Sequence, residues 1–342
     1  MKKPYIALTL AALIPALSQM PGNSFAGRWD MTVTSAKEQF PSWMEVVEKD
    51  GNLQVRVQGH TGNVNPAASV SRDGARLIVT VTAAAPAIPA TETRPASPAR
   101  PGLVWELTQK GNRLTGTQRQ GDNQWQLAGV RAPALQRAAP GAWGNPEPLF
   151  NGKDLTGWAE MNDTPHIVGT VPSHWVAKGG ELINEDRGAN LRTTRTFDDF
   201  KLHVEYNCPA GENSGIYLRG RYEVQVAPPP PPARSGGAAG GGARAGAVPR
   251  NPYLGVGCVY GQLGPSTPPP FRADWQTYDI ALVGRRVTVV FNGVTTIDNQ
   301  EIPGITGGAL DSNEAEPGPI YLQGDHHGGI RYRNVTISLP RR

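Results

Sequence analysis

Side chains that can transfer protons gather on three short segments in the second half of the chain, 200–207, 215–219 and 222–226. Each segment alternates apolar and polar residues, as expected of a β-strand with one buried face. Side chains two positions apart on a strand point to the same side. The alternation therefore predicts one shared polar face that carries these six residues: His203, Glu205, Tyr217, Arg219, Glu223 and Gln225.

This predicted polar face has two interpretations. A solvated outer sheet would need no function, but it would usually be rich in Lys and Thr. Here the face combines carboxylates, an amide, a guanidinium and a phenol, the groups that fix sugar hydroxyls in a binding site. Retaining glycosidases on a β-sandwich need two carboxylates about 5 Å apart. Segment 222–226 holds one carboxylate, Glu223, so ordinary two-carboxylate chemistry is disfavoured.

Two adjacent histidines, His326 and His327, lie in a glycine-rich turn at 324–329. They could act as a general acid or base, as ligands of a divalent metal, or as plain turn residues. Neighbouring residues on a loop are a poor chelating pair, so the sequence identifies no cofactor and leaves a divalent metal open. After the turn, the apolar positions change parity near Arg333 and Asn334, which predicts a β-bulge.

The first half of the chain holds the elements of a separate, smaller unit. Residues 27–131 contain seven short strand-like segments with a hairpin signal at 49–52 and no helical period. They predict an antiparallel β-domain, either a barrel or a sandwich. Its opening Gly27-x-Trp29 resembles the start of lipocalin-like chains. The segment holds no catalytic cluster, which favours an accessory role.

The second half predicts a larger all-β unit. A Pro/Ala-rich linker at 132–142 leads into residues 143–340, where about twelve strand-like segments predict two packed sheets, a jelly-roll sandwich. Asn292-Gly293 between two of them is a strong hairpin signal. Residues 228–250 are rich in Pro, Gly and Arg and cannot bury a core, so we expect a long loop there.

The N-terminus predicts a signal peptide over residues 1–26. Lys2 and Lys3 precede an uncharged apolar stretch, and small residues allow cleavage after Ser18 or Ala26. The stretch is shorter than the roughly 20 residues that span a bilayer. We therefore expect a periplasmic or secreted protein without a membrane span. Without the two lysines the chain has 31 basic and 29 acidic residues, a net charge of +2 that argues against a nucleic-acid partner.

Export also bears on the two cysteines, Cys208 and Cys258. In an oxidising compartment they could form a disulfide that closes a long loop and stabilises the fold by roughly 4 kcal/mol. They could equally be two buried thiols on neighbouring strands. The sequence leaves both alternatives open.

An ordered series of motifs in residues 143–340 resembles the 3-keto-disaccharide hydrolase domain, a concanavalin A-like jelly roll. The series covers about 190 residues and does not extend to the first half of the chain. Its motifs are Leu149-Phe150-Asn151-Gly152-Lys153-Asp154-Leu155-x-Gly157-Trp158, Phe197-x-Asp199-Phe200-x-Leu202, Asn213-Ser214-Gly215-Ile216-Tyr217-Leu218-Arg219, Tyr222-Glu223-Val224-Gln225-Val226, Tyr260-Gly261, Trp275-x-x-Tyr278, Phe291-Asn292-Gly293, Ile320-Tyr321-Leu322-Gln323-x-x-x-His327-Gly328 and Arg333-Asn334-Val335.

The resemblance implies an enzyme that cleaves 3-keto-glycosides by elimination and hydration, with net hydrolysis. In that interpretation Glu223 transfers the proton, Arg219 steadies an enolate, and Glu205 or His327 handles the second proton. The same interpretation gives sugar contacts to six further residues: Gln225, Tyr217, Gln323, His203, Tyr260 and Arg333. One departure is that the Pro/Gly/Arg segment replaces a short, often acidic stretch that the resembling domains commonly carry.

Two other functions stay open at this point. A concanavalin-like sandwich can bind sugar as a lectin without turning it over, since a fold does not dictate a function. The protein could also be a scaffold of an exported assembly, with the Pro/Gly/Arg loop as the contact segment. The oligomeric state does not follow from the sequence.

Overall fold

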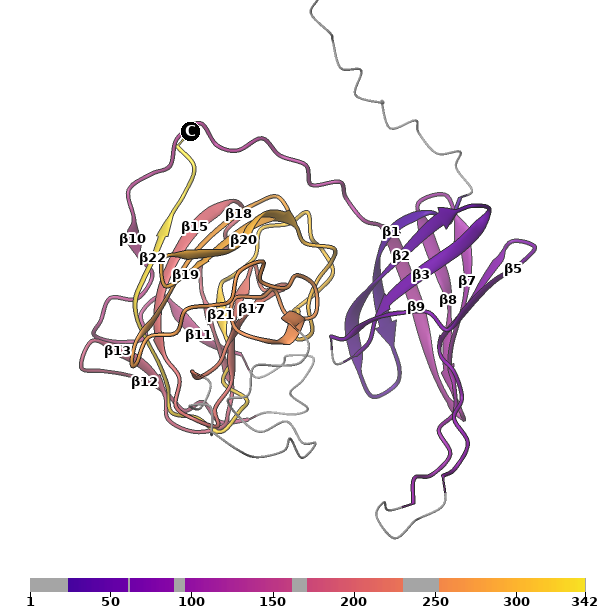
Figure 1. Ribbon diagram of the computed structural model, residues 1–342, viewed down its shortest axis with the longest axis horizontal. Coiled ribbons are helices and arrows are strands. Elements are labelled where there is room, and N and C mark those ends of the chain that lie inside the picture. Colours follow the sequence, from indigo (N-terminus) through magenta and orange to yellow (C-terminus); the bar gives the residue numbers. More distant parts are fainter. Residues whose placement is uncertain (1–23, 61, 89–95, 162–170, 230–251, 342) are drawn as a thin grey trace, which may run out of the picture.

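The computed structural model describes residues 24–60, 62–88, 96–161, 171–229 and 252–341. Within them the protein is built almost wholly of antiparallel strands, which form two bodies side by side (Figure 1). The predicted all-β class is confirmed. Most of the predicted signal peptide and of the predicted loop at 228–250 lies outside the described residues, so both remain predictions.

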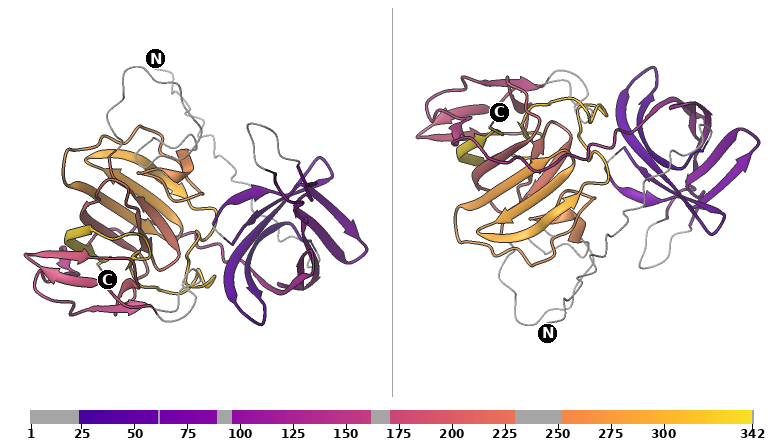
Figure 2. Two further views of the ribbon diagram at one scale, coloured as in Figure 1. Left: turned by 90° about the horizontal axis from the view of Figure 1, so that it is seen from below. Right: turned by 90° about the horizontal axis from the view of Figure 1, so that it is seen from above.

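The N-terminal body is one strongly curved antiparallel sheet, which we call the half-barrel. Its strands follow the order β4-β3-β2-β1-β9-β8-β7-β6-β5, and two views along its length show the curl (Figure 2). The strands are β1 (Gly27–Thr34), β2 (Gln39–Lys49), β3 (Asn52–Gln58), β4 (Val64–Pro66), β5 (Ser69–Asp73), β6 (Arg76–Thr82), β7 (Leu103–Lys110), β8 (Arg113–Gln120) and β9 (Asn123–Arg131).

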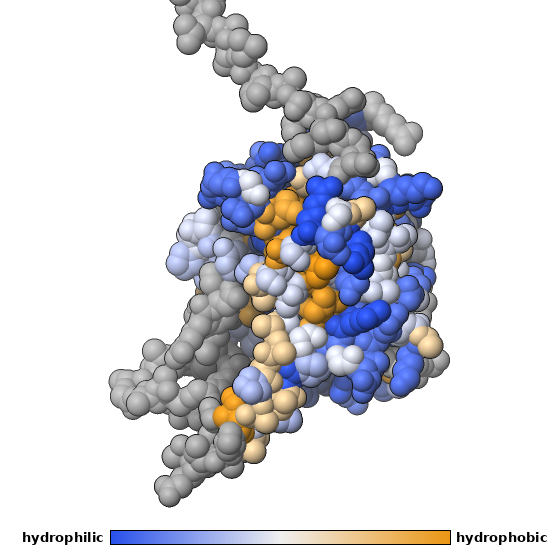
Figure 3. Space-filling model, turned by 90° about the vertical axis from the view of Figure 1, so that its right-hand side faces the viewer, coloured by the Kyte–Doolittle hydropathy of each residue, from blue (hydrophilic) through white to orange (hydrophobic). Residues whose placement is uncertain are grey.

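Alternation along these strands gives the half-barrel its own core. Trp29, Met31 and Val33 of β1 point inward with Trp105 and Leu107 of β7, and all are almost fully buried. Burying each such side chain contributes about 1.5–3 kcal/mol. A partly open pocket of about 190 Å³ lies between Phe40, Trp105 and Trp125. The face turned away from the second body is mostly hydrophilic around a narrow apolar strip (Figure 3).

The C-terminal body is a sandwich of two sheets. The large sheet has the order β12-β13-β22-β15-β18-β19-β20, with β10 on β22, and the small sheet has the order β11-β14-β21-β16-β17. The strands are β10 (Glu147–Pro148), β11 (Trp158–Met161), β12 (Trp175–Lys178), β13 (Glu181–Asn184), β14 (Asn190–Thr193), β15 (Phe200–Asn207), β16 (Ser214–Leu218), β17 (Tyr222–Val226), β18 (Gln276–Val283), β19 (Arg286–Phe291), β20 (Val294–Glu301), β21 (Tyr321–Leu322) and β22 (Ile330–Ser338).

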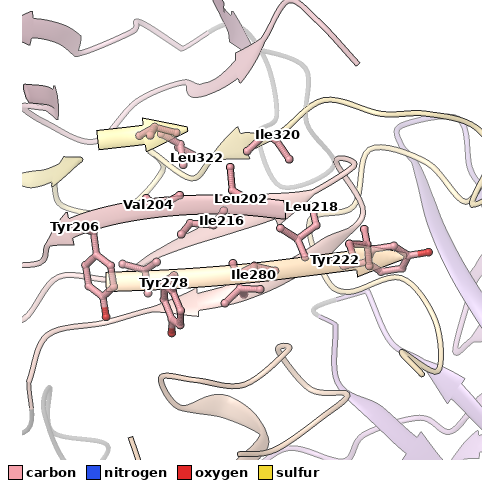
Figure 4. Close-up of a cluster of buried hydrophobic side chains, with 14 of the residues drawn as sticks. Leu202, Val204, Tyr206, Ile216, Leu218, Tyr222, Tyr278, Ile280, Ile320 and Leu322 are labelled. Carbon is pink, nitrogen blue, oxygen red and sulfur yellow. The ribbon is translucent and has the colours of Figure 1, made fainter. Parts of the chain in front are cut away.

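The core of this body lies between the two sheets. Leu202 and Val204 of the large sheet face Ile216, Leu218 and Leu322 of the small sheet (Figure 4). All are essentially inaccessible to water. The residues that alternate with these core residues along each strand of the small sheet therefore point to its opposite, outer face. This outer face holds the candidate site.

Three local predictions are confirmed. The hairpin at Asn292-Gly293 joins β19 to β20 with both residues at positive φ, and Asp50-Gly51 does the same between β2 and β3. The pairing of β15 with β22 skips one residue near Asn334, whose φ is +50°, so the predicted bulge is present. Cys208 and Cys258 are both buried free thiols, so the disulfide is absent, although neither cysteine lies in a strand as the second alternative had it.

Candidate active site

A row of four side chains crosses the outer face of the small sheet. Arg192 of β14 is opposite Tyr321 of β21, Tyr321 is opposite Tyr217 of β16, and Tyr217 is opposite Glu223 of β17. Neighbouring strands lie about 4.8 Å apart, so the row spans about 14 Å between its end Cα atoms. Arg192 and Glu223 therefore lie at the two ends of the row, with the two tyrosines between them.

Glu223 is the buried end of this row. Its side chain is 5% exposed, and the phenol of Tyr217 donates to Glu223 Oε2 at 3.0 Å. The pKa of Glu223 is raised from 4.5 to about 8. Burial is the main cause and the charge of Asp325 adds to it, whereas the hydrogen bond from Tyr217 lowers the pKa. The carboxyl is therefore mostly protonated at neutral pH, which suits a general acid.

Glycine at position 215 makes room for this carboxyl. A Cβ atom built on Gly215 would lie 2.6 Å from Glu223 Oε1, closer than non-bonded atoms approach. The family-like motif Asn213-Ser214-Gly215 thus has a steric purpose in β16. The space beside β17 exists only because this position has no side chain.

The two tyrosines of the row form a rigid floor. The rings of Tyr217 and Tyr321 stack with centroids 3.9 Å apart and an interplanar angle of 11°. Met161 is buried against them, and Leu310 packs on the same cluster. The Tyr217 hydroxyl also lies 2.8 Å from the carbonyl oxygen of Gly307. Because both rings are almost fully buried, they position other groups rather than offer a surface to a ligand.

Polar atoms without partners surround Glu223. The Oε1 atoms of Gln225 and Gln323 and the Oδ1 atom of Asp325 are buried and have no hydrogen-bond partner among the described residues; Asp325 Oδ1 lies 3.9 Å from His326 Nε2. Gln225 donates instead from Nε2 to Asn213 Oδ1 at 2.9 Å, and Asn213 Nδ2 lies 3.1 Å from His326 Nε2. Buried acceptors without donors are costly, and the hydroxyl groups of a bound sugar would satisfy them.

Of the two histidines, His326 is the one whose ring reaches this group. The side chain of His327 is exposed, and only its backbone N–H is anchored, to Glu212 Oε1 at 3.2 Å. Sequence reasoning preferred His327 because of its position in the motif. Asp325 and Arg192 were not predicted from the sequence. Strand alternation was the available signal for Arg192, because it lies two positions from buried Asn190 in a short strand and therefore shares its face.

Tyr260 lies at the edge of the site, and its role as a sugar contact stays a prediction. Its backbone N–H donates to the carbonyl oxygen of Glu223 at 2.9 Å, so the 257–263 segment runs along β17. Burial, and then the charge of Glu223, raise the pKa of the Tyr260 phenol. That coupling places the phenol within electrostatic reach of the carboxyl.

The prediction of a single polar face over three strands is wrong for His203 and Glu205, and Arg333, a predicted sugar contact, lies with them on the other sheet. Strand β15 pairs with β18 and β22 in the large sheet, whereas β16 and β17 belong to the small sheet. The outer faces of the two sheets point in opposite directions. There Arg333 donates to Glu205 Oε2 at 2.7 Å, and His203 lies 2.7 Å from Asp279 Oδ1 beside a groove of about 390 Å³.

Arg219 also departs from its expected position beside Glu223. Its φ of +51° breaks the strand alternation at the end of β16. The fully buried guanidinium donates to the carbonyl oxygen of Gly284 at 2.6 Å and to Tyr222 and Asp198, each at 3.2 Å. Tyr222 belongs to the core between the sheets. Arg219 therefore fastens one end of the sandwich and does not face the carboxyl of Glu223.

Within the described residues, no three His, Cys, Asp or Glu side chains gather in a group that could hold a metal ion. The same part of the chain contains no helix with the length and apolarity required to cross a membrane.

Comparison with known proteins decides the family. Residues 145–338 match the family model of the 3-keto-alpha-glucoside-1,2-lyase-like domain, which is more than half of the chain. The chain belongs to this family. The resemblance drawn from the sequence motifs is confirmed, and the C-terminal body is a 3-keto-alpha-glucoside-1,2-lyase-like domain.

The solved structures to which the chain is similar include two candidate glycosyl hydrolases from Parabacteroides distasonis. One is 24% identical, with coverage of 59% of this chain and 92% of its own and a TM-score of 0.42. The other is 19% identical, with coverage of 56% and 92% and a TM-score of 0.42. No curated protein matches the chain.

Proposed function

We propose that the C-terminal domain cleaves 3-keto-glycosides on the outer face of the small sheet, with Glu223 as the acid. One observation carries this proposal: a buried carboxyl with a pKa of about 8 adjoins buried polar atoms that lack partners. The family description, a 3-keto-alpha-glucoside-1,2-lyase-like domain, supports the choice of substrate.

The chemistry requires one base and one acid. A ketone at C3 acidifies the proton on C2, and a base removes it to give an enolate. As the enolate collapses to a C1–C2 double bond, the C1–O bond breaks and the departing oxygen takes a proton from the acid. Water then adds across the double bond, its hydroxyl to C1 and a proton to C2, so that the net result is hydrolysis.

The site offers a group for each step. Protonated Glu223 gives its proton to the departing oxygen. Asp325, whose charge raises the pKa of Glu223, takes the proton from C2. Asp325 replaces the sequence candidates Glu205 and His327, which lie on the other sheet and on the surface. Arg192 at the far end of the row takes over the enolate-stabilising role assigned to Arg219.

The remaining polar groups suit sugar recognition. The free Oε1 atoms of Gln225 and Gln323 accept hydrogen bonds from hydroxyl groups, and the half-buried phenol of Tyr260 lies at the rim. Gln225 lies in β17 and Gln323 directly follows β21, so these two acceptors are held in place before a ligand arrives. Preorganised donors and acceptors of this kind favour the transition state over the ground state.

The test is incubation of the full chain with 3-keto-trehalose and with trehalose, followed by product analysis. We expect cleavage of the keto sugar and none of trehalose, which lacks the acidifying ketone. Failure to cleave any of several 3-keto-glycosides contradicts the proposal. Binding of the keto sugar without product would instead support a carbohydrate-binding module.

A further inference from the structure

One segment of the C-terminal body, residues 302–316, supplies contacts to the proposed site. The carbonyl oxygen of Gly307 accepts a hydrogen bond from the Tyr217 hydroxyl, and that of Gly308 accepts one from the Tyr321 hydroxyl. The Thr306 hydroxyl oxygen accepts a hydrogen bond from the backbone N–H of Glu223 at 2.8 Å. The position of the tyrosine floor and of the strand that carries Glu223 thus depends on the 302–316 segment.

The half-barrel holds this same segment from its other side. The indole N–H of Trp43 donates to the carbonyl oxygen of Ile305 at 3.0 Å. Gly304 lies flat against the ring, since a Cβ atom there would come within 2.5 Å of it. Trp43 is 1% exposed and packs into the core of the C-terminal body although it belongs to β2.

A second contact joins two glycines. Gly62, in the turn between β3 and β4, meets Gly307 so closely that a Cβ atom on Gly62 would lie 2.7 Å from Gly307 Cα and N. Gly307 is the residue whose carbonyl oxygen receives the Tyr217 hydroxyl. The backbone contact between Gly62 and Gly307 therefore connects the half-barrel to the hydrogen-bond network of Glu223.

A buried ionic group fixes the rest of the segment. Arg28 of β1 donates to the carbonyl oxygens of Ile302 and Pro303 and pairs with Glu314, which is 1% exposed. Arg285 lies 3.4 Å from the same carboxylate, and Tyr222 donates to it at 2.7 Å. Removing one partner from such a buried group is strongly destabilising, so the two bodies are not joined by a loose tether.

We propose that the half-barrel is a positioning domain for the proposed active site, and that Trp43 and Gly62 are positioning residues acting through the 302–316 segment. This inference rests on the proposed function, in which Glu223 transfers the proton. It gives the N-terminal body a role that its own residues, which lack a catalytic cluster, do not indicate. The half-barrel sets the geometry of the site without touching the substrate.

Two pairs of matched variants of the full chain test the inference. Gly62→Ala introduces the clash with Gly307, and Gly51→Ala, also at positive φ, introduces backbone strain in open space. Trp43→Phe removes the hydrogen bond to Ile305, and Trp29→Phe removes an equivalent buried bond to Phe25 within the half-barrel. The control variants account for the loss of stability that any such change causes.

The first readout needs no substrate. Hydrogen exchange of residues 302–316 and 222–226 should accelerate in Gly62→Ala and Trp43→Phe relative to their controls. A ¹³C NMR titration of Glu223 should show its pKa falling from about 8 toward 4.5, because a loosened segment admits water and relieves the burial that raises it. Equal exchange and equal titration in test and control variants would overturn the inference.

The second readout is turnover of a 3-keto-glycoside. A displacement of about 1 Å in a catalytic group costs up to roughly 100-fold, so kcat should fall by about 10- to 100-fold with little change in KM. The controls should keep the wild-type kcat. If the wild-type protein cleaves no 3-keto-glycoside, the proposed function fails, while exchange and titration still decide whether the half-barrel positions Glu223. Should Gly62→Ala not fold, the tryptophan pair gives the answer.

Discussion

Tyr217 and Glu223 face each other across β16 and β17, with the phenol oxygen 3.0 Å from Glu223 Oε2 and 2.8 Å from the carbonyl oxygen of Gly307. A phenol has one hydrogen and cannot donate to both acceptors at once. When Glu223 is protonated, its own O–H can point to the phenol oxygen while Tyr217 donates to Gly307. The arrangement therefore accommodates a protonated carboxyl, in agreement with its raised pKa.

Replacing Glu223 by Gln should remove the proton donor while keeping the shape of the side chain. We expect kcat on a cleaved 3-keto-glycoside to fall by roughly 10²–10⁴-fold, the usual contribution of a positioned acid or base. Circular dichroism and the melting temperature should show an intact fold. A rate close to that of the wild type would refute the assignment.

Glu205→Gln is the corresponding change on the other sheet. Glu205 is paired with Arg333 and Asn334 on the outer face of the large sheet, and this pair is partly exposed. A partly exposed ion pair of this kind contributes at most about 1 kcal/mol. We expect unchanged kcat and KM and a slightly lower melting temperature. A large loss of kcat would mean that the large sheet takes part in the chemistry.

Tyr217→Phe should shift the pH profile in a defined direction. The hydrogen bond from Tyr217 lowers the pKa of Glu223, so its loss should raise that pKa further above 8. The alkaline limb of kcat/KM, where the protonated acid is lost, should move to higher pH. Tyr321→Phe serves as the comparison, since that phenol bonds to Gly308 and not to the carboxyl. A shift to lower pH would contradict the proposed hydrogen-bond network.

Arg192→Gln should weaken stabilisation of the enolate. Arg192 is exposed at the end of the row that contains Glu223, and no other cation of the described chain occupies that row. We expect kcat to fall by roughly 10²-fold, as when one preorganised stabilising group is removed. Arg195→Gln, which breaks an exposed pair with Glu147, should leave turnover unchanged. Equal rates for both variants would exclude Arg192 from the reaction.

Stability should decrease from acidic to alkaline pH. Burial raises the pKa of Glu223 to about 8, and burial together with the charge of Glu314 raises that of Asp30 to about 8. The folded state then binds more protons than the unfolded state, so these groups contribute most below about pH 4 and lose their contribution as pH rises toward 8. Urea unfolding at pH 5, 6.5 and 8 measures the trend. Asp30→Asn with Glu223→Gln should flatten it, and an unchanged slope would argue against the raised values.

The sequence determined the local geometry of this protein. Period-two alternation placed Glu223 and Gln225 on the face opposite Val224, turn chemistry placed the hairpins at Asp50-Gly51 and Asn292-Gly293, and a parity change placed the bulge near Asn334. The ordered motifs of residues 143–340 were enough to indicate the family that the comparison confirmed. Each of these features depends on residues that are neighbours along the chain.

Only the tertiary structure decided which strands share a sheet. Alternation fixes the two faces of a strand but not its partner, and pairing is set by packing between residues distant in sequence. In this sandwich the chain passes from the large sheet at β15 to the small sheet at β16, which separates Glu205 from Glu223. A left-handed backbone at Arg219 turned its side chain away, and the 302–316 segment joined Glu223 to the half-barrel. The pKa of Glu223 has the same origin, because desolvation depends on all the atoms that surround the carboxyl in space, whatever their position in the sequence.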